Sequence, residues 1–211
     1  MIGAGPGIGL SVARRFARAG LSVGVVARSA ESIEKASAAL AGTSHAGVTA
    51  DAADEPRLRA ALDELVDRFG VPEIVVYNAA IIQADAIGEL TAAEHLDALA
   101  VNLVGAITTA DHLLPRMAAT GAGTYLMTGG MPAPVEGMTT LSIAKPGLRA
   151  LAGLLDQQYR SAGLRVATVT VTGTVAPGTA FDPDLIAERY WQLHAEHGGR
   201  WAPLVAFEGL G

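Results

Sequence analysis

The segment Gly3-Ala4-Gly5-Pro6-Gly7-Ile8-Gly9 decides the fold of this chain. Glycine has no Cβ and tolerates positive φ, so a ligand can approach the backbone of such a turn closely. A helix beginning here points its first N–H groups at the turn, where they attract phosphate. The spacing is Gly-x-x-x-Gly-x-Gly, and Ile8 stands where the Gly-x-Gly-x-x-Gly dinucleotide fingerprint has its third glycine. We predict a pyrophosphate-binding turn; a glycine-rich turn without a ligand is the alternative.

Outward from this turn, short apolar runs alternate with segments of helical periodicity. Such alternation is typical of βα units on a parallel sheet, and right-handed crossovers place helices on both of its faces. We therefore predict one α/β domain over residues 1–211, a Rossmann-like doubly wound parallel sheet with its ligand site at the carboxyl edge. The predicted helices are 7–19, 29–40, 56–70, 91–99, 104–119 and 142–161, and the predicted strands are 22–27, 46–50, 74–77, 124–128 and 166–171.

The strand expected before the glycine turn is short. Only Met1 and Ile2 precede Gly3, where a whole strand is expected at the centre of the sheet. We expect the first strand to be truncated, with some loss of stability.

Composition excludes several classes of function. The chain has 15 Lys+Arg against 21 Asp+Glu and a formal net charge of −6, which argues against nucleic acid as a partner. It has no cysteine, so disulfides, thiolate nucleophiles and Cys-ligated zinc are ruled out. Neither a signal peptide nor an uninterrupted apolar run of about 18 residues is visible, which predicts a cytoplasmic protein without a membrane partner.

The end of the second predicted strand indicates which dinucleotide would bind. Sites that prefer NAD place an acid there for the ribose hydroxyls, whereas an arginine can pair with a 2′-phosphate. This chain has Arg28 and Ser29, and its next acid is Glu31. We therefore favour NADP(H) over NAD(H).

These motifs together resemble the short-chain dehydrogenase/reductase family over residues 3–179. The resemblance assigns the glycine turn to cofactor binding and Asp51, with Ala52, to contact with adenine. Asn78-Ala79-Ala80 resembles the family's Asn-Ala-Gly turn, and Asn102 resembles its structural and catalytic asparagine. The fold and the cofactor are the properties that this resemblance implies most specifically.

The family's catalytic motif is incomplete in this chain. The family uses Tyr-x-x-x-Lys on the long helix, and this segment reads Leu141-Ser142-Ile143-Ala144-Lys145. Leucine can neither donate nor accept a proton, so the usual acid is missing, while Lys145 can still bind the nicotinamide ribose. By spacing, Thr128 stands in for the family's serine, although alignment along the strand would place Gly130 there.

Past the last predicted strand, the resemblance assigns Gly173 and Val175 to the nicotinamide pocket. Residues 178–199 look like a mobile lid with an apolar lining, although Tyr190, Trp191 and His194 suit core packing better. His194 and His197, with Glu196 between them, lack a third ligand at a recognisable spacing, so we predict no metal site. Family members commonly form dimers or tetramers, and the apolar positions Leu113, Leu114, Leu148, Leu151 and Leu155 fit either such an interface or the core.

Two functions remain open. The first is an atypical NADP(H)-dependent oxidoreductase for a small carbonyl or alcohol, with Lys145 on the ribose, Asn102 ordering water and Thr128 polarising the substrate. The second is a non-catalytic NADP(H)-binding or regulatory protein that has lost the family's general acid.

Overall fold

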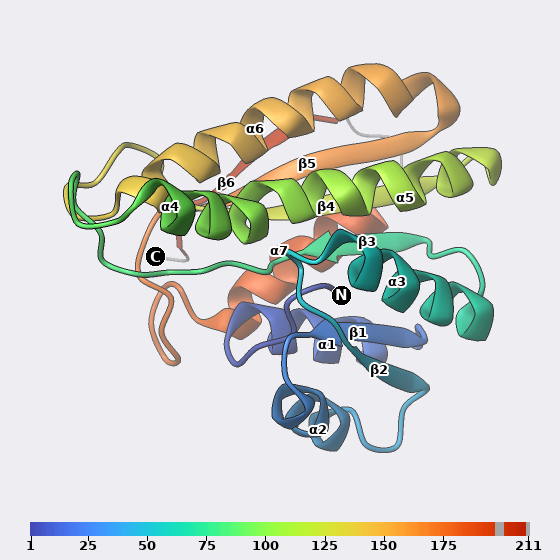
Figure 1. Ribbon diagram of the computed structural model, residues 1–211. Helices are drawn as coiled ribbons and strands as arrows, with labels where there is room; N and C mark the ends of the chain where they lie inside the picture. The colour runs from blue at the N-terminus through green and yellow to red at the C-terminus, as the bar shows by residue number, and fades with distance from the viewer. Residues whose placement is uncertain (197–200, 210–211) are drawn as a thin grey trace.

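The computed structural model describes residues 1–196 and 201–209 (Figure 1). All of its strand pairs are parallel, and the strands lie in the order β2-β1 and β3-β4-β5-β6. The predicted doubly wound sheet is therefore confirmed. The strands are β1 (Val23–Ala27), β2 (His45–Thr49), β3 (Ile74–Tyr77), β4 (Gly123–Gly129), β5 (Leu164–Val171) and β6 (Leu204–Phe207).

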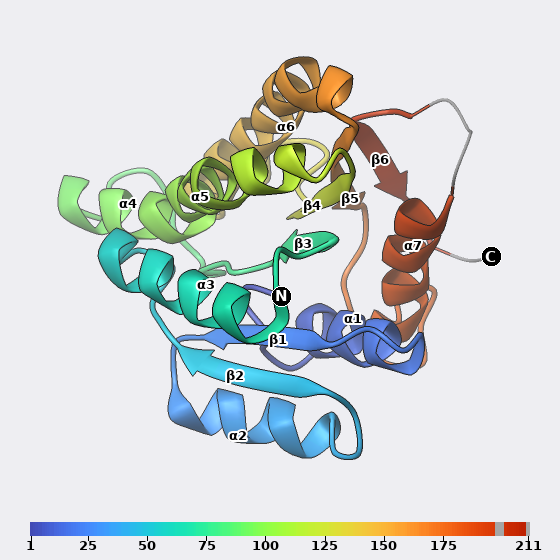
Figure 2. The ribbon, with the colours of Figure 1, turned by 90° about the vertical axis from the view of Figure 1, so that its right-hand side faces the viewer.

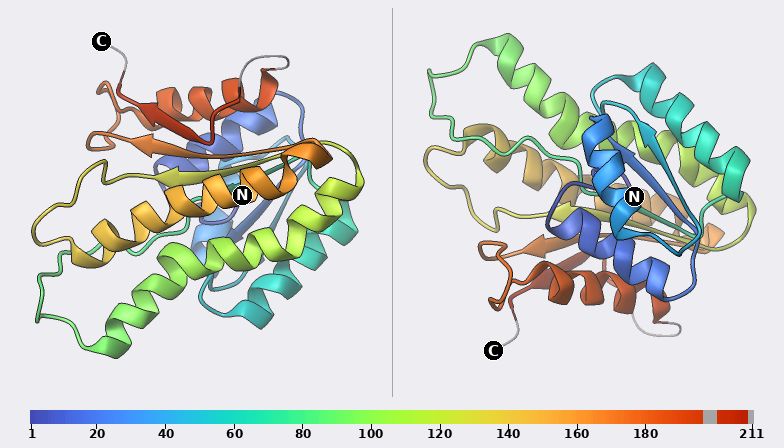
Figure 3. Two further views of the ribbon diagram at one scale, coloured as in Figure 1. Left: turned by 90° about the horizontal axis from the view of Figure 1, so that it is seen from above. Right: turned by 90° about the horizontal axis from the view of Figure 1, so that it is seen from below.

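Helices cover both faces of the sheet, as Figures 2 and 3 show. One core packs α3, α5 and α6 against the strands, and the other packs α1, α2 and α7 against the opposite face. The helices are α1 (Ile8–Arg18), α2 (Ala30–Ala39), α3 (Glu55–Phe69), α4 (Ala92–Leu99), α5 (Gly105–Ala119), α6 (Thr139–Tyr159) and α7 (Pro183–Ala195), with a π-helical turn η1 (Ala100–Val104) and a 3₁₀ turn η2 (Arg160–Ala162). The sequence did not predict α7 and β6.

Ile2 joins the two groups of strands. It bridges Val26 of β1 and Tyr77 of β3, and its N–H donates to the Val76 carbonyl at 2.9 Å. This single bridged position occupies the place of the strand that the sequence predicted to be very short. Ile2 thus connects β1 to β3 directly before the glycine turn.

Side-chain caps fix where several helices begin. Ser29, Asp54 and Thr91 each accept a hydrogen bond from a backbone N–H of the first helical turn. The start of α6 differs from the prediction, which placed it at residue 142 with Pro146 in the first turn or so. Asp85 accepts from Thr140 N–H at 2.9 Å, and so α6 begins at Thr139 and Pro146 lies in its interior.

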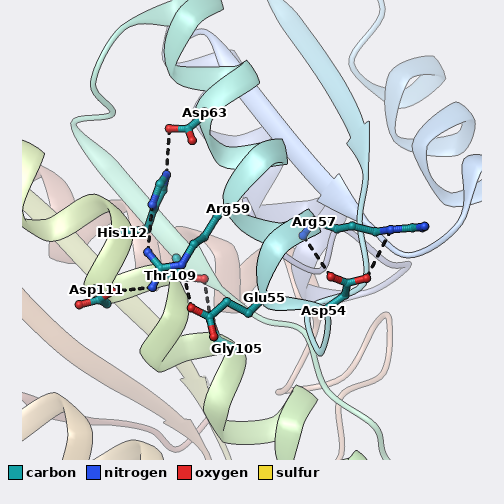
Figure 4. A network of polar contacts seen from close by, with 9 residues as sticks. All are labelled: Asp54, Glu55, Arg57, Arg59, Asp63, Gly105, Thr109, Asp111 and His112. Atoms are coloured by element: carbon teal, nitrogen blue, oxygen red, sulfur yellow. Dashed lines mark hydrogen bonds and ion pairs between the residues drawn. The ribbon is translucent and has the colours of Figure 1, made fainter.

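A polar network ties α3 to α5 at the surface (Figure 4). Arg59 donates to Asp111 at 2.6 Å and to Glu55 at 2.9 Å. His112 lies 2.9 Å from Asp63, whose pKa is lowered mainly by that hydrogen bond. Exposed pairs of this kind contribute roughly 0–1 kcal/mol each, so the cores rather than this network carry the fold.

The helical stretch from Ala92 to Ala119 is long and apolar enough to meet a composition test for a membrane span, with a mean hydropathy of 1.2. Half of its most apolar 18-residue stretch is buried. The core includes Ala106, Ala110, Leu113, Leu114 and Met117 from this helical segment. Such burial is typical of the core helix of an α/β domain.

Candidate active site

A cavity of about 1760 Å³ follows the carboxyl edge of the sheet. It exceeds the ~300–1,000 Å³ of a typical small-molecule site, so it has room for a dinucleotide and a second small ligand. Its lining includes most residues that the sequence singled out: Gly3, Gly5, Gly7, Ile8, Arg28, Ser29, Asp51, Ala52, Asn78, Ala79, Ala80, Thr128, Lys145, Gly173 and Val175. Gly9 and Asn102 do not belong to this lining.

The glycine turn has two kinds of glycine. A Cβ on Gly3 would lie 2.4 Å from Ala79 N, and one on Gly9 would lie 2.2 Å from the Gly3 carbonyl oxygen. A Cβ on Gly5 or Gly7 would meet nothing within 4 Å. Gly3 and Gly9 are therefore required by packing, while Gly5 and Gly7 leave an open floor before the first N–H groups of α1. Such a cradle fits a pyrophosphate.

Arg28 is exposed at the end of β1 and makes no hydrogen bond or ion pair with any described residue. Ser29 caps α2 by accepting from Ser32 N–H at 3.2 Å. The nearest acid in sequence, Glu31, is bonded to Lys35 at 2.6 Å, and this bond lowers its pKa. This corner of the cavity thus combines a free guanidinium with the N-terminus of a helix.

Asn78 holds the glycine turn in place. Its side chain donates to the Gly3 carbonyl at 2.9 Å, and its backbone N–H donates to Ile2 at 2.8 Å. Asp51 closes a turn after β2 by accepting from Ala53 N–H at 2.9 Å. Both residues line the cavity, and Asn78 has a structural task that its motif alone did not reveal.

Asn102 lies in η1 and is fully buried. Its side chain accepts from Ile81 N–H at 2.7 Å and donates to the Ile81 carbonyl at 3.0 Å. It therefore fixes the segment after β3, with Val101 beside it facing the cavity. We assign it as a positioning residue; its role in ordering water stays a prediction.

Lys145 and Leu141 lie one helical turn apart on α6, and both line the cavity. Their exposed fractions are 6% and 7%. The Lys145 ammonium donates to the Thr128 carbonyl at 2.8 Å. Burial lowers the pKa of Lys145 from 10.5 to about 8.

Thr128 contacts α7 through its hydroxyl and Lys145 through its backbone carbonyl. Its Oγ1 accepts from the Tyr190 phenol of α7 at 2.8 Å, within the core that packs α1 and α7. Its backbone carbonyl is the acceptor for Lys145. The contact that Thr128 makes with the lysine therefore runs through the main chain, which any residue at this position would provide.

Two sets of contacts beside the cavity were not predicted. Arg149 donates to the carbonyls of Gly130 and Met131 at 3.1 and 3.2 Å, and it supports Met131 at a φ of 48°. Positive φ is uncommon outside glycine, so the loop after β4 is strained. Asp85 also accepts from the Thr140 hydroxyl, and His95 lies 3.1 Å from that hydroxyl. Asp85 is 55 residues from Thr140, so no local pattern marks the pair.

The segment after β5 is closely packed at Gly173 and exposed at Val175. A Cβ on Gly173 would lie 2.2 Å from the Phe181 ring, while Val175 is 37% exposed. In the segment predicted as a lid, 178–199, Tyr190 is fully buried and Trp191 packs edge-on against Phe16. Core packing of Tyr190 and Trp191, which lie on α7, is thus confirmed. The mobility of this segment stays a prediction, and residues 197–199 lie outside the described residues.

No cluster of three or more His, Asp or Glu side chains able to hold a metal occurs in the part of the chain that the structure describes. His194 lies 3.1 Å from Thr124 Oγ1, and its ring packs beside Phe16 and Trp191. His197, the second histidine of that motif, lies outside the described residues.

A parallel, doubly wound sheet with a glycine cradle at its carboxyl edge defines the class of dinucleotide-binding α/β domains. The sequence profile described as "short chain dehydrogenase" matches residues 1–184, so the chain belongs to the short-chain dehydrogenase family. The family assigns it as an NAD(P)-dependent oxidoreductase.

Named relatives show how far the similarity extends. Oxidoreductase asL5 of Sarocladium schorii is 32% identical over 199 residues, covering 92% of this chain and 77% of its own. D-threitol dehydrogenase of Mycolicibacterium smegmatis is 28% identical over 174 residues, covering 81% and 67%.

Solved structures superpose closely on this fold. A 3-ketoacyl-ACP reductase of Sinorhizobium meliloti 1021 has a TM-score of 0.90 and 25% identity, covering 98% of this chain and 95% of that one. A metagenomic short-chain oxidoreductase in complex with NADP has a TM-score of 0.89 and 22% identity, covering 97% and 93%.

Proposed function

We propose that this protein is an NADP(H)-dependent oxidoreductase that interconverts a small carbonyl compound and its alcohol. One observation carries the proposal: a single cavity is lined by the glycine cradle, by Arg28 and Ser29, and by the buried Lys145. A bound nicotinamide dinucleotide would supply or accept the hydride there.

The residues of this chain would bind, orient and exclude water. The glycine cradle would hold the pyrophosphate, Asp51 and Ala52 would flank the adenine, and Lys145 would hold the ribose hydroxyls. Ala79, Ala80, Gly173 and Val175 would line the ring. We assign Thr128 to positioning Lys145 through its backbone carbonyl. Its hydroxyl accepts from Tyr190 and keeps its own O–H, so a role in polarising the substrate stays a prediction.

Arg28 is expected to set the preference for NADP(H). Substituting Arg28 with alanine should weaken NADPH binding about 10- to 100-fold, because charge-assisted hydrogen bonds contribute roughly 1.5–3 kcal/mol. NADH binding should change less than about threefold. Fluorescence titration of both cofactors measures this, with Arg57→Ala as the control, since Arg57 is exposed and does not line the cavity. Equal losses for both cofactors would contradict the assignment, and failure of the wild type to bind either would remove the proposed function.

The substrate end of the cavity favours an apolar substrate. Three loops meet there, and they expose Ile82 by 72%, Val135 by 49% and Val175 by 37%. Exposed apolar side chains around a cavity mark a binding surface for an apolar ligand. We therefore expect a medium-chain aliphatic ketone to be reduced with higher kcat/KM than a polyhydroxylated ketone of the same length.

Ile82→Asp should lower kcat/KM for the aliphatic ketone about 10- to 100-fold, because burying a large aliphatic side chain contributes roughly 1.5–3 kcal/mol. Ile87→Asp is a matched control. Ile87 is the same residue type, is 83% exposed in the same segment, and lies outside the cavity. If the polyhydroxylated ketone proves the better substrate, or if both variants behave alike, the apolar assignment is wrong.

Oligomer formation is part of the proposal. Leu113, Leu114 and Leu148 are buried in the core, so they are not available for an interface. Other apolar side chains are exposed on α4, η1, α5 and α6, namely Leu96, Val104, Ile107, Ile143 and Leu154. We propose that these residues form the contact of a homodimer or homotetramer.

The second candidate is a non-catalytic NADP(H)-binding or regulatory protein. The observation that favours it is Leu141, because the cavity has a hydrocarbon one turn before Lys145. NADPH binding without NADPH consumption across a panel of aliphatic and aromatic ketones and aldehydes would support this candidate over the first.

A further inference from the structure

Lys145 is a buried cation without a buried counter-ion. The contact that its ammonium makes among the described residues is with the Thr128 carbonyl, at 2.8 Å. An ammonium has three N–H bonds, and a single carbonyl satisfies one of them. Because Lys145 lines the cavity, the other N–H bonds are available to molecules bound there.

The groups around Lys145 do not neutralise it. Burial is the cause of its lowered pKa, and no carboxylate contributes. On α6 itself, Arg149 is bonded to the carbonyls of Gly130 and Met131. At the start of α6, Asp85 and His95 are joined to Thr140, and from η1 Asn102 is neutral and bonded to Ile81. The acids that line the cavity are Asp51, in the turn after β2, and Asp182 and Asp184 at the start of α7. Asp182 accepts from the N–H groups of Gly178 and Asp184, and Asp184 is bonded to Arg14.

Phenols are excluded from this part of the cavity. Tyr77 donates to the Val101 carbonyl at 2.6 Å, Tyr125 to the Ala106 carbonyl at 2.8 Å, and Tyr190 to Thr128. All three are buried, and burial raises their pKa values. No tyrosine belongs to the cavity lining among the described residues.

Hydroxyl groups near the lysine are also engaged elsewhere. Ser142 lies next to Leu141 but does not belong to the cavity lining, and its Oγ accepts from Val135 N–H at 3.1 Å. The Thr128 hydroxyl accepts from Tyr190 and keeps its own O–H, but an aliphatic hydroxyl is a far weaker acid than an ammonium. Lys145 is therefore the strongest acid that the cavity presents at this point.

We propose that the Lys145 ammonium is itself the proton donor for carbonyl reduction, and that the neutral amine is the base for alcohol oxidation. This inference rests on the proposed function and adds the identity of the acid. In reduction, one Nζ–H bond of Lys145 would break as the O–H bond of the alcohol forms, with the hydride for the carbonyl carbon supplied by a bound reduced nicotinamide dinucleotide. The neutral amine then takes a proton from solvent. Oxidation runs through the same atoms in reverse.

The chain permits a direct test by NMR, because Lys35 and Lys145 are its only lysines. Lysine labelled with ¹³C at Cε gives one resonance for each, and Lys35→Arg identifies which is which. We expect the Lys145 resonance to titrate with a midpoint near pH 8. In the wild type, kcat/KM for reduction should fall about tenfold per pH unit above that midpoint, and kcat/KM for oxidation should rise up to it.

Two variants separate charge from proton transfer. Lys145→Arg keeps a cation for cofactor binding, but guanidinium does not release its proton at these pH values. We expect kcat to fall at least about 100-fold, the pH break to disappear, and NADPH affinity to stay within about tenfold of the wild type. Lys145→Met should lose the same activity even if arginine packs poorly, and Lys35→Arg should keep the wild-type profile.

Failure of this inference is distinguishable from failure of the proposed function. If the wild type binds NADPH and turns over, but Lys145→Arg keeps its kcat or its pH break, the proton comes from another group and the inference is overturned. A kinetic break far from the NMR midpoint also overturns it. If the wild type does not bind NADPH, the proposed function itself is wrong.

Discussion

Gly9→Ala is expected to destabilise the protein by about 3 kcal/mol and to weaken NADPH binding at least 100-fold. The added Cβ would lie 2.2 Å from the Gly3 carbonyl oxygen and 2.9 Å from Asn78 Nδ2. The first atom belongs to the backbone, so the glycine turn must move away from α1. That movement also breaks the Asn78 to Gly3 hydrogen bond and displaces the N–H groups that would hold the pyrophosphate.

Chemical denaturation followed by tryptophan fluorescence measures this loss, since Trp191 packs against Phe16 of α1 and reports on its seating. Gly5→Ala is the matched control for stability: its Cβ meets nothing within 4 Å, and we expect a change of about 0.5 kcal/mol or less. Gly7→Ala should fall between the two, at about 1–2 kcal/mol, because Gly7 has open space but a φ of 97°. Equal stabilities for the Gly5 and Gly9 variants would show that the turn and the helix do not approach as closely as described.

The elements that sequence predicted well are those that local chemistry determines. Ser29 begins α2 and Asp54 begins α3 because a side-chain oxygen reaches N–H groups three residues on. The glycine turn follows from φ and the lack of a Cβ, which are properties of single residues. The residues that line the cavity could also be predicted, because the carboxyl ends of parallel strands meet at one edge of the sheet.

The parts that sequence could not predict depend on distant contacts. The start of α6 is set by Asp85, and the Thr128 hydroxyl accepts a hydrogen bond from Tyr190, which lies 62 residues away. The positive φ of Met131 depends on Arg149 holding the carbonyls on both sides of that peptide. None of these pairs has a spacing that a pattern could recognise. Motifs therefore place residues at the site, but tertiary contacts decide which of their atoms face the substrate.

Lys145 is expected to lower the stability of the folded protein, because burying its ammonium is unfavourable. We expect Lys145→Met to increase the free energy of unfolding at pH 7 by about 2 kcal/mol. A pKa that falls from 10.5 to about 8 on folding corresponds to roughly 3 kcal/mol against the folded state at neutral pH. Methionine removes that penalty and fills similar space. It also leaves the Thr128 carbonyl without its donor, which lowers the free energy of unfolding by about 1 kcal/mol.

The pH dependence distinguishes this cause from better packing. Below pH 8 the lysine is protonated in both the folded and the unfolded protein, so the difference between Lys145→Met and the wild type should be constant. Between about pH 8 and 10.5 the unfolded state binds the proton more tightly, so wild-type stability rises with pH relative to the variant and the difference closes. Denaturant unfolding at pH 7, 8, 9 and 10 measures it, with exposed Lys35→Met as the control, expected to change stability by about 0.5 kcal/mol or less. A difference that stays constant to pH 10 would mean that the lysine is not held in the desolvated state that direct proton transfer from its ammonium requires.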